Sequence, residues 1–173
     1  MITAVTQTLA SLLAIGTSLN STEQIDFGLP TAEEYTEPGL NLYCYSLKPS
    51  SWLQQCNSHL EKESLDSHPN QTALIAPTQW SDVSFVITAN DYTSLGKQRL
   101  LSEAFMLLSS HRILKEELLA SVLQGYGNLQ LTISNFATGD TIALWNALGV
   151  PFRPALYVTL TIPLNLKNVP TLS

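Results

Sequence analysis

The sequence of 173 residues predicts an α/β (α+β) fold in a single domain, with a mixed four- to five-stranded sheet and helices packed mainly on one face. Two observations lead to this prediction. Four segments alternate apolar and polar residues with the period of two that is typical of half-buried strands. Helical patterns connect these segments on either side of the third one, which favours a mixed sheet.

The N-terminal stretch MITAVTQTLASLLAIGTSLNS predicts an amphipathic helix. Its apolar residues recur close to helical spacing on one face: Ile2, Val5, Leu9, Leu12 and Leu13. A cleaved signal peptide is the alternative, but no Lys or Arg precedes the apolar stretch. No window reaches the roughly 20 apolar residues of a membrane-spanning helix, so we expect no spanning segment.

A polar connection at 20–39 contains IDFGLP, in which Pro30 ends an extended piece. It leads into the first predicted strand, LNLYCYSL at 40–47. The residues at 48–80 are rich in Ser, Gln, Asn and His, and we interpret them as a long polar loop with one short helix around 51–60. A loop of this length inside a compact domain is usually functional or disordered.

The second predicted strand is DVSFVITA at 82–89. After it, the apolar stripes in 98–123 predict two consecutive helices, with a break near His111. Gly125 and Gly127 end the second of these helices, because glycine readily adopts the backbone conformation of a helix terminus.

The third predicted strand is NLQLTIS at 128–134. A further helix should begin near 138–140, where a hydroxyl or carboxylate can accept bonds from free amides. It should end at Gly149, which suits a left-handed terminus, and Pro151 forbids its continuation. The last predicted strand follows at 156–162.

The second face of the predicted strands carries almost no charge. Its residues are Ser84, Thr88, Gln130, Thr132, Tyr157, Thr159 and Thr161. A solvated face normally takes Lys and Glu, so a neutral face could pack against another surface. The alternative is a half-exposed sheet with ordinary strand propensity, since Thr and Tyr are favoured in any strand.

Arg153 is a lone cation between Pro151 and Pro154 in a nearly uncharged part of the chain. An unpaired buried guanidinium is costly, so Arg153 must meet a carboxylate or carbonyls of its own fold or reach a partner. We favour the partner. Trp145 is expected in the core, with an interface anchor as the alternative, because Trp and Arg dominate binding hot spots. The candidate interface residues are Arg153, Trp145, Pro154, Tyr157, Thr159 and Thr161.

Composition and motifs argue against several functions. A net charge of −6 without a Lys or Arg cluster argues against binding nucleic acid. The three histidines are far apart, and none has the spacing of a helical zinc site. The chain contains neither a phosphate-binding glycine loop nor a G-x-S-x-G motif. We therefore expect no enzyme, no cofactor and no metal. The low content of charged residues, 13%, favours a protein that works as part of an assembly.

Taken as a whole, the pattern resembles the cap, or tail-terminator, proteins of contractile injection systems, which are phage-tail-like particles with a sheath around a rigid tube. The most specific match is W-x-x-L-G-x-P-x-R-P-x-L at 145–156. The supporting pieces are the N-terminal helix, IDFGLP, GLNLYCYSL, DVSFVITA and the helix pair from Arg99 to Leu119. The resemblance covers essentially the whole chain except the loop at 48–79.

The resemblance implies a non-enzymatic structural protein with one tail-terminator-like domain over 1–173. Typically six copies of such a protein form a ring on the tube end distal to the baseplate, where they stop tube and sheath growth and hold the last sheath ring. The implied partners are further copies of the chain, the inner tube protein and the sheath protein. The sheath could add a strand to an open sheet edge.

A ring built from copies of one chain requires two different surfaces on each copy that bind each other, with contacts that close the ring. The implied location is the cytoplasm during assembly, and afterwards a particle that is released or held at a membrane. The alternative function is a non-enzymatic adaptor that forms no ring.

Overall fold

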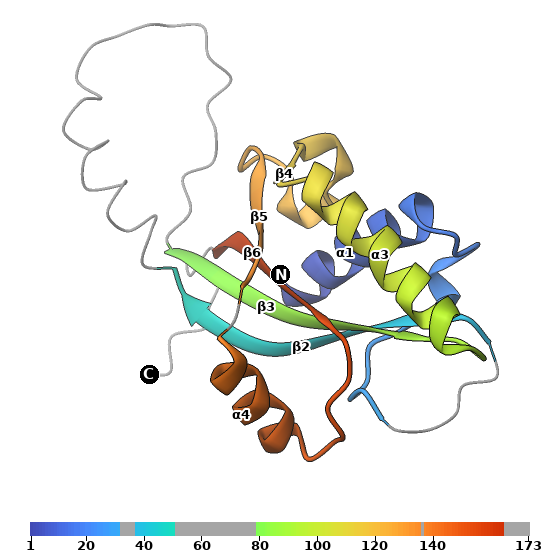
Figure 1. Ribbon diagram of the computed structural model, residues 1–173. Coiled ribbons are helices and arrows are strands. Elements are labelled where there is room, and N and C mark those ends of the chain that lie inside the picture. Colours follow the sequence, from blue (N-terminus) through green and yellow to red (C-terminus); the bar gives the residue numbers. More distant parts are fainter. Residues whose placement is uncertain (32–36, 51–78, 136, 165–173) are drawn as a thin grey trace, which may run out of the picture.

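The computed structural model describes residues 1–31, 37–50, 79–135 and 137–164. These residues form a six-stranded sheet with the order β1-β2-β3-β6-β5-β4 (Figure 1). β1 (Ile25–Asp26) pairs with β2 in parallel, and every other neighbouring pair is antiparallel. The mixed sheet confirms the predicted fold class. The predicted count of four to five strands was wrong, because β1 and β4 (Ile113–Leu114) are too short to show an alternating pattern.

The centre of the sheet consists of strands that the alternating pattern had predicted. Their bounds are β2 Gly39–Pro49, β3 Gln79–Asn90, β5 Leu129–Ile133 and β6 Leu156–Leu164. The core face of β3 includes Val83, Phe85 and Ile87, all fully buried, and β6 contributes further buried apolar residues to the same cluster. This alternation confirms that one face of the sheet is core.

The long polar loop is shorter at both ends than predicted. β2 continues through Lys48 and Pro49, and β3 already begins at Gln79. The rest of the predicted loop, 51–78, with the helix expected at 51–60, lies outside the described residues.

Two helices pack on the core face of the sheet (Figure 1). They are α1 (Ile2–Gly16) and α3 (Ser94–Ser110). Val5, Leu9 and Leu13 of α1 are fully buried, which confirms the predicted amphipathic helix. Full burial of three large side chains makes α1 an integral part of the core.

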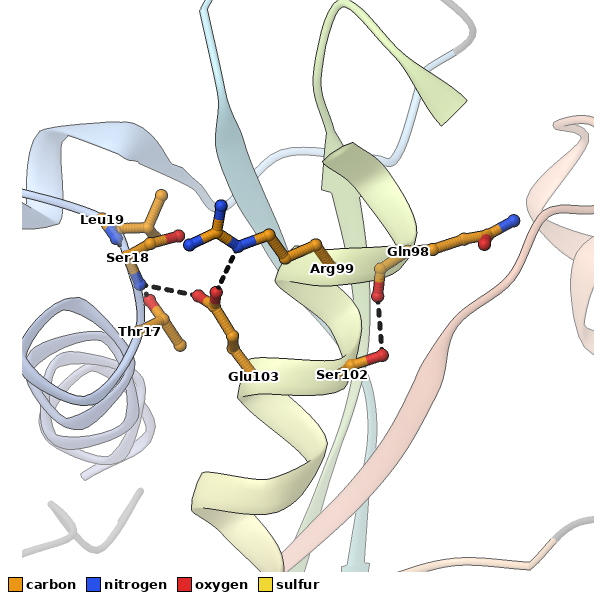
Figure 2. A network of polar contacts seen from close by, with 7 residues as sticks. All are labelled: Thr17, Ser18, Leu19, Gln98, Arg99, Ser102 and Glu103. Carbon is orange, nitrogen blue, oxygen red and sulfur yellow. Dashed lines mark hydrogen bonds and ion pairs between the residues drawn. The ribbon is translucent and has the colours of Figure 1, made fainter. Parts of the chain in front are cut away.

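A polar network ties the end of α1 to α3 (Figure 2). The backbone amide of Ser18 donates to Oε2 of Glu103 at 2.8 Å, and Nε of Arg99 donates to Oε1 of the same carboxylate at 2.8 Å. The bond from the Ser18 amide, assisted by Arg99, lowers the pKa of Glu103 below its ordinary value. The Gln98 side chain extends from the other side of α3, away from this network (Figure 2).

The second of the two consecutive helices was a wrong prediction. After α3 the chain forms β4 and two 3₁₀ turns, Glu116–Leu118 and Ser121–Leu123. The turns bury Leu119 and Leu123, and Leu118 and Val122 of the expected helical stripe are exposed. A compact pair of turns thus buries residues other than most of the predicted stripe. The pair bonds to α1, because the Ala120 amide donates to the Thr8 hydroxyl at 3.0 Å.

Candidate assembly interface

The junction between the last helix and the last strand has the predicted geometry. α4 (Thr138–Leu148) ends at Gly149, whose φ of 68° and ψ of 23° are left-handed. The expected side-chain cap at 138–140 was wrong: Ala137 precedes the helix, and no side chain caps it. The helix begins with a bond of 3.2 Å from the Thr141 amide to the Ala137 carbonyl, which also accepts a bond of 3.3 Å from the Thr141 hydroxyl.

α4 lies on the sheet face opposite α1 and α3 (Figure 1), and Trp145 connects it to Tyr157 of β6. Its indole Nε1 donates to the Tyr157 hydroxyl at 2.8 Å, and its side chain is 1% exposed. The Phe152 ring contacts it edge to face, with ring centroids 6.0 Å apart. The predicted burial of Trp145 is confirmed. A role for Trp145 in an interface stays a prediction. Because its side chain is buried, Trp145 would act by holding the junction between α4 and β6 in place.

Part of the neutral face satisfies its polar groups across the strands, whereas the buried Thr88 hydroxyl has no hydrogen-bond partner among the described residues. The hydroxyls of Ser84 and Thr159 bond across the strands at 3.0 Å, and Thr161 donates to Oδ1 of Asp82 at 2.7 Å. Tyr45 also bonds to Ser84, and burial raises the pKa of its phenol. Thr159 and Thr161 are half-buried. Their role in an interface stays a prediction.

Arg153 and Pro154 lie in a different place, a groove of about 420 Å³ between the first turns of α3 and the segment 151–154. Lys97 and Arg153 are the charged residues of its lining, and Leu101 and Phe152 add apolar surface. Phe152 is 64% exposed. We name this feature, with Lys97, Leu101 and 151–154, the basic groove.

Among the described residues, the lining of the basic groove contains no carboxylate that could pair with Arg153. Within the part of the chain that the structure describes, Arg153 forms no hydrogen bond or ion pair. The first alternative from the sequence, a carboxylate or carbonyl of the same fold, thus finds no support among the described residues. The guanidinium is half-buried and faces a space that a partner can enter.

Sequence reasoning missed Lys97 as a neighbour of Arg153. The sequence did contain a signal for an earlier helix start, namely Asp91 and Thr93, two residue types that cap helices. In the structure the Thr93 hydroxyl accepts a bond of 2.9 Å from the Gly96 amide, and Oδ1 of Asp91 accepts one of 2.8 Å from the Thr93 amide. This cap starts α3 at Ser94, four residues earlier than the apolar stripe suggested. It places Lys97 in the first turn of the helix.

A second groove of about 240 Å³ has the opposite charge. Glu23, Asp26 and Glu37 line it, and Asn90 belongs to the linings of both grooves. The described residues include no group of three or more His, Cys, Asp or Glu side chains that could hold a metal ion. No helix in the described ranges is long and apolar enough to cross a membrane.

This fold is shared with tube-terminating proteins. It matches the sheath/tube terminator of PVC, an extracellular contractile injection system, in its extended state, with a TM-score of 0.63 and 16% identity over 97% of this chain. It also matches the tube-terminating cap of the anti-feeding prophage, with a TM-score of 0.60 and 15% identity over 95% of this chain. The chain spans 57% and 55% of those two proteins, so the likeness concerns a little over half of each.

The sequence also places the chain within a family. Residues 4–171 match the Pvc16 N-terminal domain, and the chain therefore belongs to the Pvc16 N-terminal domain family. No curated protein matches it with significant sequence similarity. Family and fold together confirm the resemblance to the cap proteins of contractile injection systems.

Proposed function

We propose that this chain is a structural cap that ends the inner tube and sheath of a contractile injection system. The observation that carries the proposal is the fold shared with two tube terminators over nearly the whole chain. Membership of the Pvc16 N-terminal domain family supports it independently of the fold comparison. In this proposal residues 1–173 work as one tail-terminator-like domain, without catalytic activity.

In the proposed assembly, copies of the chain form a ring on the distal tube end, with six copies as the expected number. The ring covers the end of the inner tube and prevents the addition of further subunits. Such a ring needs two different surfaces on each copy, because its contacts are heterologous. The basic groove is one surface that suits such a contact, because Arg153 has no hydrogen bond or ion pair among the described residues.

The outer edge of β2 is the proposed place for the last sheath ring. β1 pairs with β2 only at Leu40 and Asn41, so the edge from Leu42 to Pro49 has no strand partner among the described residues. The opposite edge of the sheet is better covered, since β4 and the Arg112 carbonyl bond to β5. An open edge of this length can accept a strand from a sheath subunit by backbone hydrogen bonds.

The proposed location follows the particle: assembly in the cytoplasm, and then release or attachment at a membrane as part of the complete injection system. The alternative is a monomeric or dimeric adaptor that contacts particle components without forming a ring. Both alternatives have the same fold, so they differ in mass and in the place of binding.

A mass measurement in solution, with and without tube protein, separates these alternatives. The cap proposal predicts a multimer of the chain, in solution or on tubes, and labelled chain at one end of each tube in electron micrographs. Arg153→Ala should leave the fold intact and weaken ring or end-binding assembly. A chain that stays monomeric and never decorates tube ends would refute the cap proposal.

A further inference from the structure

The basic groove contrasts in charge with the rest of the chain. The chain carries a net charge of −6, whereas the groove is lined by Lys97 and Arg153 and, among the described residues, by no carboxylate. Phe152 is 64% exposed at its edge. A carboxylate next to an aliphatic side chain is the chemistry that fits two cations beside an apolar wall.

A carboxylate next to an aliphatic side chain exists elsewhere on the same chain, in the 3₁₀ turn Glu116–Leu118. The Glu117 side chain is 74% exposed, and its ion pair with Lys115 is long, at 3.9 Å, and open to solvent. Leu118 is 44% exposed beside it. Glu116 serves the fold instead, because its carboxylate accepts a bond from the Gly125 amide. The turn therefore presents one carboxylate and one leucine outward.

The first turns of α3 line the basic groove, and the segment with the 3₁₀ turn lies at the other end of this helix (Figure 1). α3 has 17 residues and spans about 25 Å at 1.5 Å per residue. Lys97 is in its first turn, and Glu116 follows six residues after Ser110, its last residue. Two complementary surfaces on opposite sides of one chain have the arrangement that a head-to-tail contact requires.

We propose that the 3₁₀ turn of one copy docks into the basic groove of the next copy. Glu117 then lies between Lys97 and Arg153, and Leu118 packs against Phe152. The inference rests on the proposed ring, for which it identifies the two matching surfaces.

The acidic groove with Glu23, Asp26 and Glu37 is the other carboxylate source for a second copy. It shares Asn90 with the basic groove and thus lies next to it. Two adjacent surfaces of opposite charge pair reciprocally about a two-fold axis, which yields a closed dimer. This reciprocal contact uses both surfaces at once and leaves neither for a further copy, so the 3₁₀ turn is the occupant that we propose.

Charge reversal tests the contact. Arg153→Glu and Glu117→Arg should each weaken self-association about tenfold or more in sedimentation velocity, because each places like charges together. The two changes in one chain should recover most of the lost association. Asp140→Arg is a matched control at an exposed site of α4, and it should leave association unchanged. If Glu23→Arg rescues Arg153→Glu and Glu117→Arg does not, the proposed occupant is wrong.

A cross-link locates the contact independently of affinity. In a background with Cys44→Ala and Cys56→Ala, Leu118→Cys and Phe152→Cys in one chain should give a ladder of oxidised oligomers, in solution or on tube ends. Each single cysteine should give dimers at most. A missing ladder in both settings overturns the inference, whereas caps seen on tube ends would still support the proposed function. A ladder without any end-binding would keep the contact and refute the cap.

Discussion

Removing the Trp145 indole should detach α4 from the sheet at a large cost in stability. The side chain is 1% exposed and makes a bond of 2.8 Å to the Tyr157 hydroxyl. Trp145→Ala should therefore lower the free energy of unfolding by about 3–5 kcal/mol. Trp145→Phe keeps most of the packing and loses the donor, so it should cost about 1–2 kcal/mol. Ile142→Ala on the same helix is the control, because Ile142 is 50% exposed and its loss should cost about 0.5 kcal/mol.

A double-mutant cycle isolates the hydrogen bond from the packing. Trp145→Phe, Tyr157→Phe and the double variant are compared by urea unfolding, followed by circular dichroism. The coupling free energy should be about 0.5–1.5 kcal/mol, the usual range for one such bond. A coupling of zero would show that the bond contributes nothing to holding α4. If Trp145→Ala cost no more than Ile142→Ala, the account of α4 as an anchored helix would be refuted.

Three further predictions concern the backbone and one carboxylate. Gly149→Ala should cost about 1 kcal/mol, because its φ of 68° is left-handed while no atom within 4 Å blocks a Cβ; an unchanged melting temperature would contradict this. Gly39→Ala should cost clearly more, since its Cβ would lie 2.5 Å from the Gln24 carbonyl oxygen, and thermal unfolding should rank it below Gly149→Ala. Glu103 has a lowered pKa, so its stabilisation is present above its ordinary value of 4.5 and is lost as the pH falls through the lower, folded-state pKa. Glu103→Gln should accordingly lose about 1 kcal/mol at pH 7 and approach the parent protein in acid; a difference independent of pH would show that the carboxylate bond to the Ser18 amide is not its cause.

The elements that local pattern predicted are those whose core-facing residues recur at every second position. β3 and β6 sit in the middle of the sheet, and this period of two is visible in Val83, Phe85 and Ile87 of β3. From Phe85 to Asn90 both faces of β3 are buried. The end of α4 was equally predictable from the sequence, because Gly149 and Pro151 act through their own backbone preferences.

The errors have a common physical cause in tertiary structure. β1 and β4 are two residues long and exist as strands only because longer neighbours offer them a partner. The second helix was expected from apolar spacing, yet Leu119 and Leu123 reach the same core from 3₁₀ turns. In this segment the apolar spacing therefore predicted neither the backbone conformation nor the buried set, because Leu118 and Val122 of the predicted stripe are exposed.

The candidate site was predictable only in part. The sequence singled out Arg153 because a lone cation in an uncharged segment needs a partner. The groove around it depends on α3, which approaches from a distant part of the chain and brings Lys97 beside it. The division of the candidate residues between the basic groove and the neutral sheet face likewise required the positions of α4 and β6 (Figure 1).

The most direct measurement of the central claim is the length of the inner tube in particles from cells that lack this chain. Negative-stain electron microscopy of these particles should show tubes of uncontrolled length with incomplete or frayed sheaths, and the intact gene supplied in trans should restore a uniform length. Tubes of normal, uniform length with complete sheaths in the deletion strain would contradict the proposal that this chain terminates them.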